Sequence, residues 1–85
     1  MRKVYLPEDC AFLLALGQTI RKHRLAKGLS QQSLAELCGV HAAYYSDLEC
    51  GKRNITILNV LHIANALGTT IHELCAEVLA DGEEA

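Results

Sequence analysis

The amino-acid sequence lacks the features that mark membrane, disordered and secreted proteins. No stretch comes near the roughly 18–20 uninterrupted apolar residues of a membrane span. The beginning of the chain is too charged for a secretory signal peptide. With 51% apolar residues, the chain is too hydrophobic for a disordered tail, and 85 residues suffice for one small domain. We therefore expect a single cytoplasmic domain.

Cysteine and histidine are present without the spacing of a metal site. The four cysteines are widely separated: Cys10, Cys38, Cys50 and Cys75. There is no C-x-x-C pair, and without a secretory signal a disulfide framework is not expected. Only Cys38 with His41 and His72 with Cys75 have the i, i+3 spacing of paired ligands, and zinc sites usually show tighter motifs. We predict no metal and no other cofactor, and cysteines that behave as small apolar residues.

Positive charge is scarce, because 8 Lys and Arg side chains stand against 10 Asp and Glu, for a formal charge of −2. All eight basic residues lie within residues 1–68, together with five of the acids, whereas residues 69–85 hold the other five acids. The chain thus combines a mildly basic body with an acidic end. That polarity fits a nucleic-acid partner, and it fits a solvated acidic terminus equally well.

Apolar residues recur three and four positions apart, and glycines separate the segments, so the sequence predicts an all-α fold of five helices. The expected helices span residues 8 or 9 to 27, 31–38, 41 or 42 to 50, 57–67, and 69 or 70 to about 81–82. Ser30 and Thr56 precede helices as N-caps. Gly28 and Gly68 follow helices where a left-handed residue is favoured. We assign residues 9–80 to the folded domain, 1–8 to an N-terminal arm and 81–85 to an acidic tail.

The most informative segment is residues 31–50, where two short helices are joined by a tight turn. Ala35 must be small so that the second of these helices can approach the first. Gly39 supplies the positive φ that the turn requires. The apolar wedge between the helices comprises Leu34, Cys38, Val40, Tyr45 and Leu48. This pattern predicts a helix-turn-helix unit, whose second helix can enter the major groove of DNA.

Three runs within and beside this segment carry a specific resemblance. They are Gln31-Gln32-Ser33-Leu34-Ala35-Glu36-Leu37-Cys38-Gly39-Val40, Tyr45-Ser46-Asp47-Leu48-Glu49, and Gly51-Lys52-Arg53-Asn54. They resemble the Cro and phage-repressor (xenobiotic-response-element-like) class of helix-turn-helix transcriptional regulators. The resemblance covers about residues 13–75 and implies a compact five-helix bundle of the lambda-repressor-like DNA-binding type.

The resemblance also implies roles for particular residues. Gln31 would bind a backbone phosphate at the N-terminus of its helix. The residues expected to contact DNA are Gln31, Gln32, His41, Ala42, Ala43, Tyr44, Ser46, Asp47, Lys52, Arg53 and Asn54. Arg24 and Glu49 match a pair that forms a largely buried salt bridge in this class. Arg2 and Lys3 would be either an arm that reaches DNA or a frayed terminus.

The sequence departs from the family pattern on the reading helix. Ala42 and Ala43 can touch a thymine methyl group but cannot make a bidentate hydrogen bond. Asp47 can accept from a cytosine amino group, and it also repels phosphates. Cys50 stands where the family commonly has Arg or Asn. These departures predict modest specificity assisted by DNA shape, or a surface reused for a protein partner.

A surplus of apolar residues near the C-terminal end predicts a homodimer that would bind a palindromic operator. The residues expected in the dimer interface are Ile57, Leu58, Leu61, Ile71, Leu74, Val78 and Leu79. The main alternative is an antitoxin-like or adaptor module with weak DNA affinity and a protein partner, such as a toxin or another regulator. Within the regulator class, the residues lean towards restriction-modification controller proteins. An enzyme is not expected, because the sequence shows no nucleophile–base pair and no phosphate loop.

Overall fold

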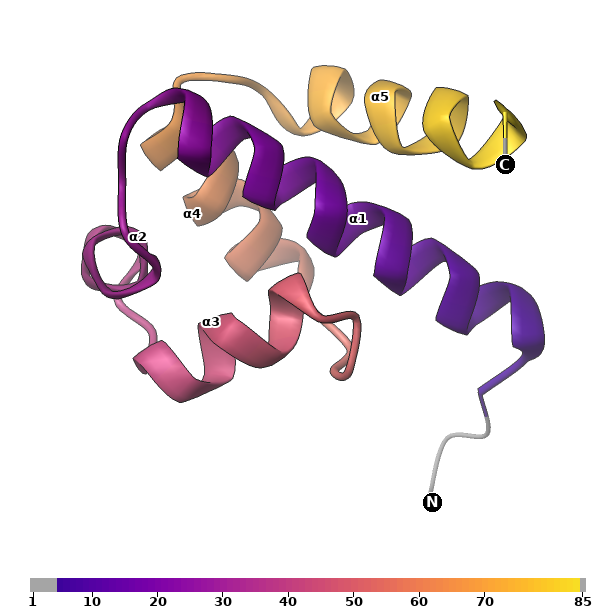
Figure 1. Ribbon diagram of the computed structural model, residues 1–85, viewed down its shortest axis with the longest axis horizontal. Coiled ribbons are helices and arrows are strands. Elements are labelled where there is room, and N and C mark those ends of the chain that lie inside the picture. Colours follow the sequence, from indigo (N-terminus) through magenta and orange to yellow (C-terminus); the bar gives the residue numbers. More distant parts are fainter. Residues whose placement is uncertain (1–4, 85) are drawn as a thin grey trace.

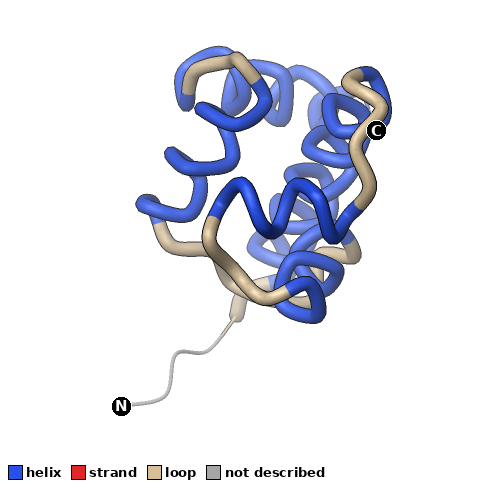
Figure 2. The backbone as a smooth tube through the Cα atoms, turned by 90° about the vertical axis from the view of Figure 1, so that its left-hand side faces the viewer, coloured by secondary structure: helices blue, strands red, loops and turns tan. Residues whose placement is uncertain are grey.

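The computed structural model describes the backbone of residues 5–84 and the side chains of residues 5–80. The described chain contains helices α1 (Pro7–Ala26), α2 (Gln31–Cys38), α3 (Ala42–Glu49), α4 (Ile57–Leu67) and α5 (Ile71–Glu84). Figure 2 shows these helices joined by short loops, with no strand in the residues that it describes. The predicted all-α class, with a helix-turn-helix at the second and third helices, is confirmed. Arg2 and Lys3 lie outside the described residues.

The helix ends follow the local sequence. α1 begins at Pro7 rather than one or two residues later, because proline suits the first position of a helix. Ser30 and Thr56 act as the predicted N-caps, accepting hydrogen bonds from the backbone N–H groups of residues 33 and 59. The predicted end of the last helix near residues 81–82 is wrong, since α5 continues to Glu84. A single glycine in a helix costs about 1 kcal/mol relative to alanine, which does not by itself end the helix.

The long helix α1 lies at the centre of the bundle. It packs against α5 on one side and against α3 on the other, as Figure 1 shows. The hydrophobic core draws on all five helices and consists of Leu16, Ile20, Leu34, Ala35, Cys38, Tyr45, Leu48, Val60, Ile63, Ala64, Leu67, Leu74 and Val78. One core therefore joins the helix-turn-helix to the rest of the domain.

Two glycines allow the C-terminal end of α3 to approach α1 closely. A Cβ on Gly17 would overlap the carbonyl oxygen of Glu49 and lie 2.5 Å from that of Leu48. Gly51 has a φ of +71°, and a Cβ there would lie 2.8 Å from the Cα of Leu14. These neighbours are backbone atoms, which cannot rotate out of the way. The position of α3 is therefore set by direct backbone contact with α1.

Candidate nucleic-acid interface

The turn between α2 and α3 has the geometry that its sequence predicts. Gly39 adopts a φ of +73°, and the N–H of Val40 donates to the carbonyl of Ala35 at 3.0 Å. The predicted wedge is confirmed, since Leu34, Cys38, Tyr45 and Leu48 are buried and Val40 packs against them. Burial raises the pKa of the Cys38 thiol. The two helices therefore form a rigid unit that leaves one side of α3 facing solvent.

A buried ion pair fastens this unit to α1. Arg24 Nε donates to Glu49 Oε2 at 2.6 Å, and Nη2 donates to Oε1 at 3.2 Å. Arg24 Nη1 also donates to the carbonyl of Leu29, and Gln31 Nε2 donates to Glu49 Oε1 at 3.1 Å. The two charged side chains are 8% and 4% exposed. The pair thus connects α1, the loop after it, α2 and the end of α3.

The protonation of the pair follows from these contacts. Burial alone would raise the pKa of Glu49, but hydrogen bonds from Arg24 and Gln31 outweigh it and hold the pKa below its usual range. The hydrogen bonds to Glu49 raise the pKa of Arg24, which stays protonated. Burial also raises the pKa of Tyr45, whose hydroxyl lies beside the pair. That hydroxyl has no hydrogen-bond partner among the described residues. The carboxylate therefore stays charged although it is buried.

The residues predicted to contact DNA at the start of α2 and α3 lie on the surface, with one partial exception. Gln32, His41, Ala42 and Ala43 are exposed. Gln31 is half-buried because its side-chain amide donates to Glu49. The Gln31 amide nitrogen carries two N–H donors, and one of them is used within the protein in the bond to Glu49. The other can donate to an outside acceptor such as a phosphate oxygen. His41 is the N-cap of α3 and makes no side-chain capping bond.

Further along α3, the predicted residues contact one another. Arg53 Nε donates to Asp47 Oδ2 at 3.0 Å, and the Arg53 guanidinium carbon lies 5.5 Å from the centre of the Tyr44 ring. Ser46 is half-buried, while Lys52 and Asn54 are exposed. A shallow, open depression of about 560 Å³ is lined by Tyr5, Tyr44, Asp47, Lys52, Arg53 and Asn54. The end of α3 and the following loop therefore form one polar, partly basic surface.

Asn59 also contacts these residues, although nothing in its sequence context singles it out. Its Nδ2 donates to the hydroxyl of Tyr44 at 3.2 Å, and that hydroxyl donates to the carbonyl of Asn54 at 3.5 Å. Asn59 lies fifteen residues beyond Tyr44 and on a different helix. No periodic pattern links the two positions, so only the three-dimensional structure reveals the contact.

The residues predicted for a dimer interface fall into three groups by exposure. Ile57, Leu58 and Leu61 on α4 and Leu79 on α5 are exposed. Leu74 and Val78 are 0% and 1% exposed, so assigning them to a dimer interface is wrong. They occupy the side of α5 that packs into the core of the same chain. Ile71 is half-buried against that core.

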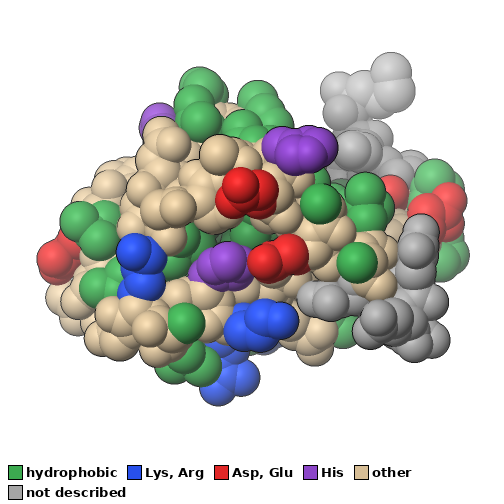
Figure 3. Space-filling view, turned by 90° about the horizontal axis from the view of Figure 1, so that it is seen from above, with side chains coloured by type: hydrophobic (Ala, Val, Ile, Leu, Met, Phe, Trp, Pro, Cys, Tyr) green, Lys and Arg blue, Asp and Glu red, His purple; other side chains and the backbone are tan. Residues whose placement is uncertain are grey.

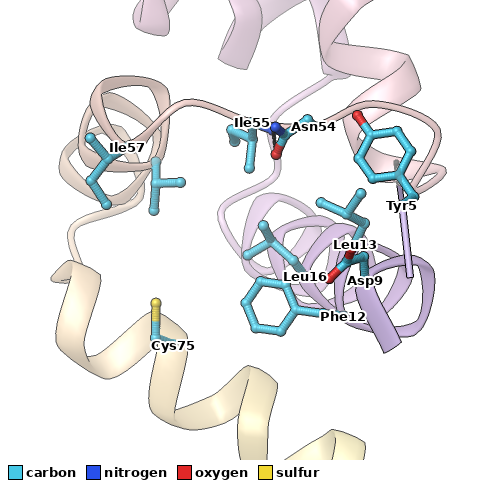
Figure 4. Close-up of a pocket in the computed structure, with 10 residues that line it drawn as sticks. Tyr5, Asp9, Phe12, Leu13, Leu16, Asn54, Ile55, Ile57 and Cys75 are labelled. Carbon is cyan, nitrogen blue, oxygen red and sulfur yellow. Dashed lines mark hydrogen bonds between the residues drawn. The ribbon is translucent and has the colours of Figure 1, made fainter. Parts of the chain in front are cut away.

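An apolar cavity of about 350 Å³ lies beside the start of α4. It opens between α1, the loop after α3, α4 and α5, and Figure 4 shows side chains from each of these segments around it. Its lining consists of Tyr5, Asp9, Phe12, Leu13, Leu16, Asn54, Ile55, Ile57, Val60 and Cys75. Asp9 is already engaged, since its carboxylate accepts from the N–H of Leu6 at 2.7 Å. The cavity is therefore mainly apolar.

The side of the molecule formed by α5 differs from the α3 side. Figure 3 looks onto it and shows basic, histidine, acidic and hydrophobic side chains intermixed. His23 Nε2 and Glu77 Oε2 are 2.7 Å apart and join α1 to α5. Within the described residues, no helix is long and apolar enough to span a membrane. The same residues contain no group of three His, Cys, Asp or Glu side chains that could hold a metal ion.

Comparison with known proteins places these features in a family. The family profile described as helix-turn-helix matches residues 20–74. Control protein C.BamHI of Bacillus amyloliquefaciens is 42% identical over 62 residues, which cover 72% of this chain and 76% of that protein. Control protein C.MunI of a Mycoplasma species is 36% identical over 66 residues, covering 76% of this chain and 89% of that protein.

Solved structures agree with the sequence matches. The restriction-modification controller protein C.AhdI of Aeromonas hydrophila has a TM-score of 0.71 and 44% identity, covering 73% of this chain and 94% of that one. The clp gene regulator ClgR of Corynebacterium glutamicum has a TM-score of 0.82 and 28% identity, covering 85% of this chain and 77% of that one. These relatives are regulators rather than enzymes. The chain belongs to the helix-turn-helix family of DNA-binding transcription regulators.

Proposed function

We propose that the protein binds a specific palindromic operator as a homodimer, with α3 of each copy in the major groove. The observation that carries the proposal is the solvent-facing side of α2, α3 and the following loop. It exposes Gln32, His41, Lys52 and Arg53, and it is held to α1 by the buried Arg24–Glu49 pair. A fixed reading helix loses little freedom when it docks, which favours binding.

The contacts divide into positioning and reading groups. We assign Gln31, Gln32, Ser46, Lys52 and Asn54 to phosphate contacts on either side of the groove. Gln32, Lys52 and Asn54 are exposed, and Gln31 and Ser46 are half-buried. His41, Ala42 and Ala43 at the exposed start of α3 face the bases. Alanine offers a methyl group to thymine but makes no hydrogen bond, so sequence preference rests on His41 and on the shape of the DNA.

The exposed apolar side chains of α4 and α5 support the homodimer. Ile57 and Leu58 are 67% and 61% exposed, and Leu61 and Leu79 are exposed as well. Pairing two copies through these side chains would remove them from water. A two-fold dimer places its reading helices about 34 Å apart, one turn of DNA, and thereby selects a palindrome.

The relatives suggest which genes the protein controls. Two of them are control proteins by name, and the solved C.AhdI is a restriction-modification controller protein. We infer that this chain regulates a restriction-modification system. A second candidate is binding of a protein partner, which the open apolar cavity beside α4 favours.

A salt titration of DNA binding tests the proposal. Duplexes are first selected from a random pool, and affinity for selected and random DNA is then measured across salt concentrations. A regulator that displaces counterions loses affinity steeply as salt rises. The logarithm of its binding constant falls against the logarithm of the salt concentration with a slope of about −0.9 per phosphate contact. Binding that is absent at low salt would reject the proposal, and a complex formed only with a second protein would favour the alternative.

A further inference from the structure

Arg53, in the loop after α3, is exposed and yet held at two points. Its side chain is 55% exposed, but Nε is bonded to Asp47 and the guanidinium lies over the ring of Tyr44. A cation within about 6 Å of an aromatic ring centre is attracted to it. A long side chain on a loop normally samples many rotamers, so these two contacts restrict where the charge can be.

The ring beneath Arg53 is fixed as well. The hydroxyl of Tyr44 accepts from Asn59 Nδ2 on α4 and donates to the carbonyl of Asn54. The ring is therefore tied to α4 and to the same loop that carries Arg53. The cluster of Tyr44, Asp47, Arg53 and Asn59 forms a support with a cation on its outer side.

The geometry leaves the guanidinium oriented for a particular use. Because Nε faces Asp47, the two Nη groups form the edge that can meet a pair of acceptor atoms. A bidentate contact of this kind suits the oxygens of a phosphate. Asp47 is 38% exposed and carries its charge beside this edge, so its own approach to a phosphate would be repulsive.

We propose that Asp47 and Tyr44 are positioning residues that hold Arg53 for a DNA phosphate, and that Asp47 contacts no base. The inference rests on the proposed DNA binding and extends it. Asp47 carries a negative charge towards DNA, and its contribution to affinity is nevertheless favourable because it acts through Arg53. Removing Asp47 therefore lowers DNA affinity only when Arg53 is present.

The test is a double-mutant cycle measured with both selected and random duplexes. In the natural chain, Asp47→Ala lowers DNA affinity about 2- to 10-fold for both duplexes, because the freed Arg53 side chain must then be ordered on binding. Asp47→Asn keeps an acceptor oxygen for Arg53 Nε, so this variant loses less DNA affinity than Asp47→Ala. In the Arg53→Ala background, Asp47→Ala causes no further loss. The unfolding midpoint of each variant is measured alongside, and Glu73→Gln on α5 serves as a matched removal of one acidic charge.

The other outcomes each overturn the inference. If Asp47→Ala raises affinity in both backgrounds, Asp47 only repels phosphate. If it changes the preferred sequence in both backgrounds, Asp47 reads a base. A chain that binds DNA equally well with Arg53→Ala rejects the inference and leaves the proposed function standing. A chain that binds no DNA at all rejects both.

Discussion

Helices α3 and α4 each turn one side to solvent, and the exposed side chains are of opposite kinds. α3 exposes Ala42 and Ala43, followed by half-buried polar residues. α4 exposes Ile57 and Leu58, which are large and aliphatic. Small and polar groups can lie in a hydrated, charged groove, whereas large aliphatic groups gain free energy by leaving water. We therefore propose that the α3 side contacts DNA and that the α4 side contacts protein.

The two sides also differ in how firmly they are attached to the rest of the domain. α3 is held by a buried ion pair and by backbone contact at Gly17, whereas the exposed residues of α4 lie on the outside of a helix whose other side fills the core. The position of α3 is therefore sensitive to single changes in α1. The exposed residues of α4 can be changed with little effect on the fold.

The largest expected effect comes from breaking the ion pair that holds α3. Arg24→Ala leaves the Glu49 carboxylate buried and unpaired, and we expect a loss of about 3–5 kcal/mol of unfolding free energy. Urea unfolding followed by circular dichroism measures it. Lys22→Ala, at an exposed position of the same helix, should change stability by less than about 0.5 kcal/mol.

The double variant Arg24→Met with Glu49→Met sharpens this prediction. An apolar pair of similar size should recover much of the lost stability, since neither charge is then stranded. If the double variant is as unstable as Arg24→Ala, packing rather than charge explains the loss.

The next effect concerns the α4 side. Leu58→Glu should raise the dimer dissociation constant about 100-fold, since each copy loses a buried leucine from a symmetric interface. Sedimentation across micromolar concentrations measures the change. Leu25→Glu replaces an exposed leucine of α1 outside the predicted interface, and it should leave the dissociation constant unaltered. Equal effects of the two variants would place the interface elsewhere.

A smaller effect is expected where α1 and α3 touch. Gly17→Ala forces the backbone of α3 away from α1 and should cost about 1–3 kcal/mol. DNA affinity should fall more than dimer affinity, because α3 moves and the exposed residues of α4 do not. Unfolding, duplex binding and sedimentation of the same variant provide the comparison. Gln18→Ala, on the exposed neighbour of Gly17, is the control, and equal losses in both affinities would contradict the assignment.

The smallest effect is a pH dependence of stability. The pKa of Glu49 is lower in the folded protein than in the unfolded chain, where it is about 4.3. Its stabilising contribution is complete above about pH 4.3 and is lost as the pH falls through the folded value. Urea unfolding between pH 7 and 3 should show this loss in the natural chain. The Arg24→Met, Glu49→Met double variant should lack that part of the dependence.

The local rules of helix formation predicted most of the fold and part of the site. Ser30, Gly39 and Thr56 act through their immediate neighbours, so their capping and turn roles can be read from the sequence. The contacts of Asn59 with Tyr44 and of Asp47 with Arg53 depend on side-chain directions that periodicity does not contain.

The same limit explains the wrong assignment of Leu74 and Val78. An apolar stripe shows that a helix buries one side, but it does not show whether the cover comes from its own chain or from another copy. α5 places these two residues against α1 and leaves Leu79 outside. Only the arrangement of the helices separates the two cases.

The assignment of DNA to one side and protein to the other can be tested in one experiment. Backbone amide NMR signals of the labelled protein are recorded as operator DNA is added and, separately, as the protein is diluted. We predict that DNA shifts the signals of residues 31–32, 41–44 and 52–54, while dilution shifts those of residues 57–61. DNA-induced shifts confined to residues 57–61, with residues 41–44 unchanged, would contradict the account.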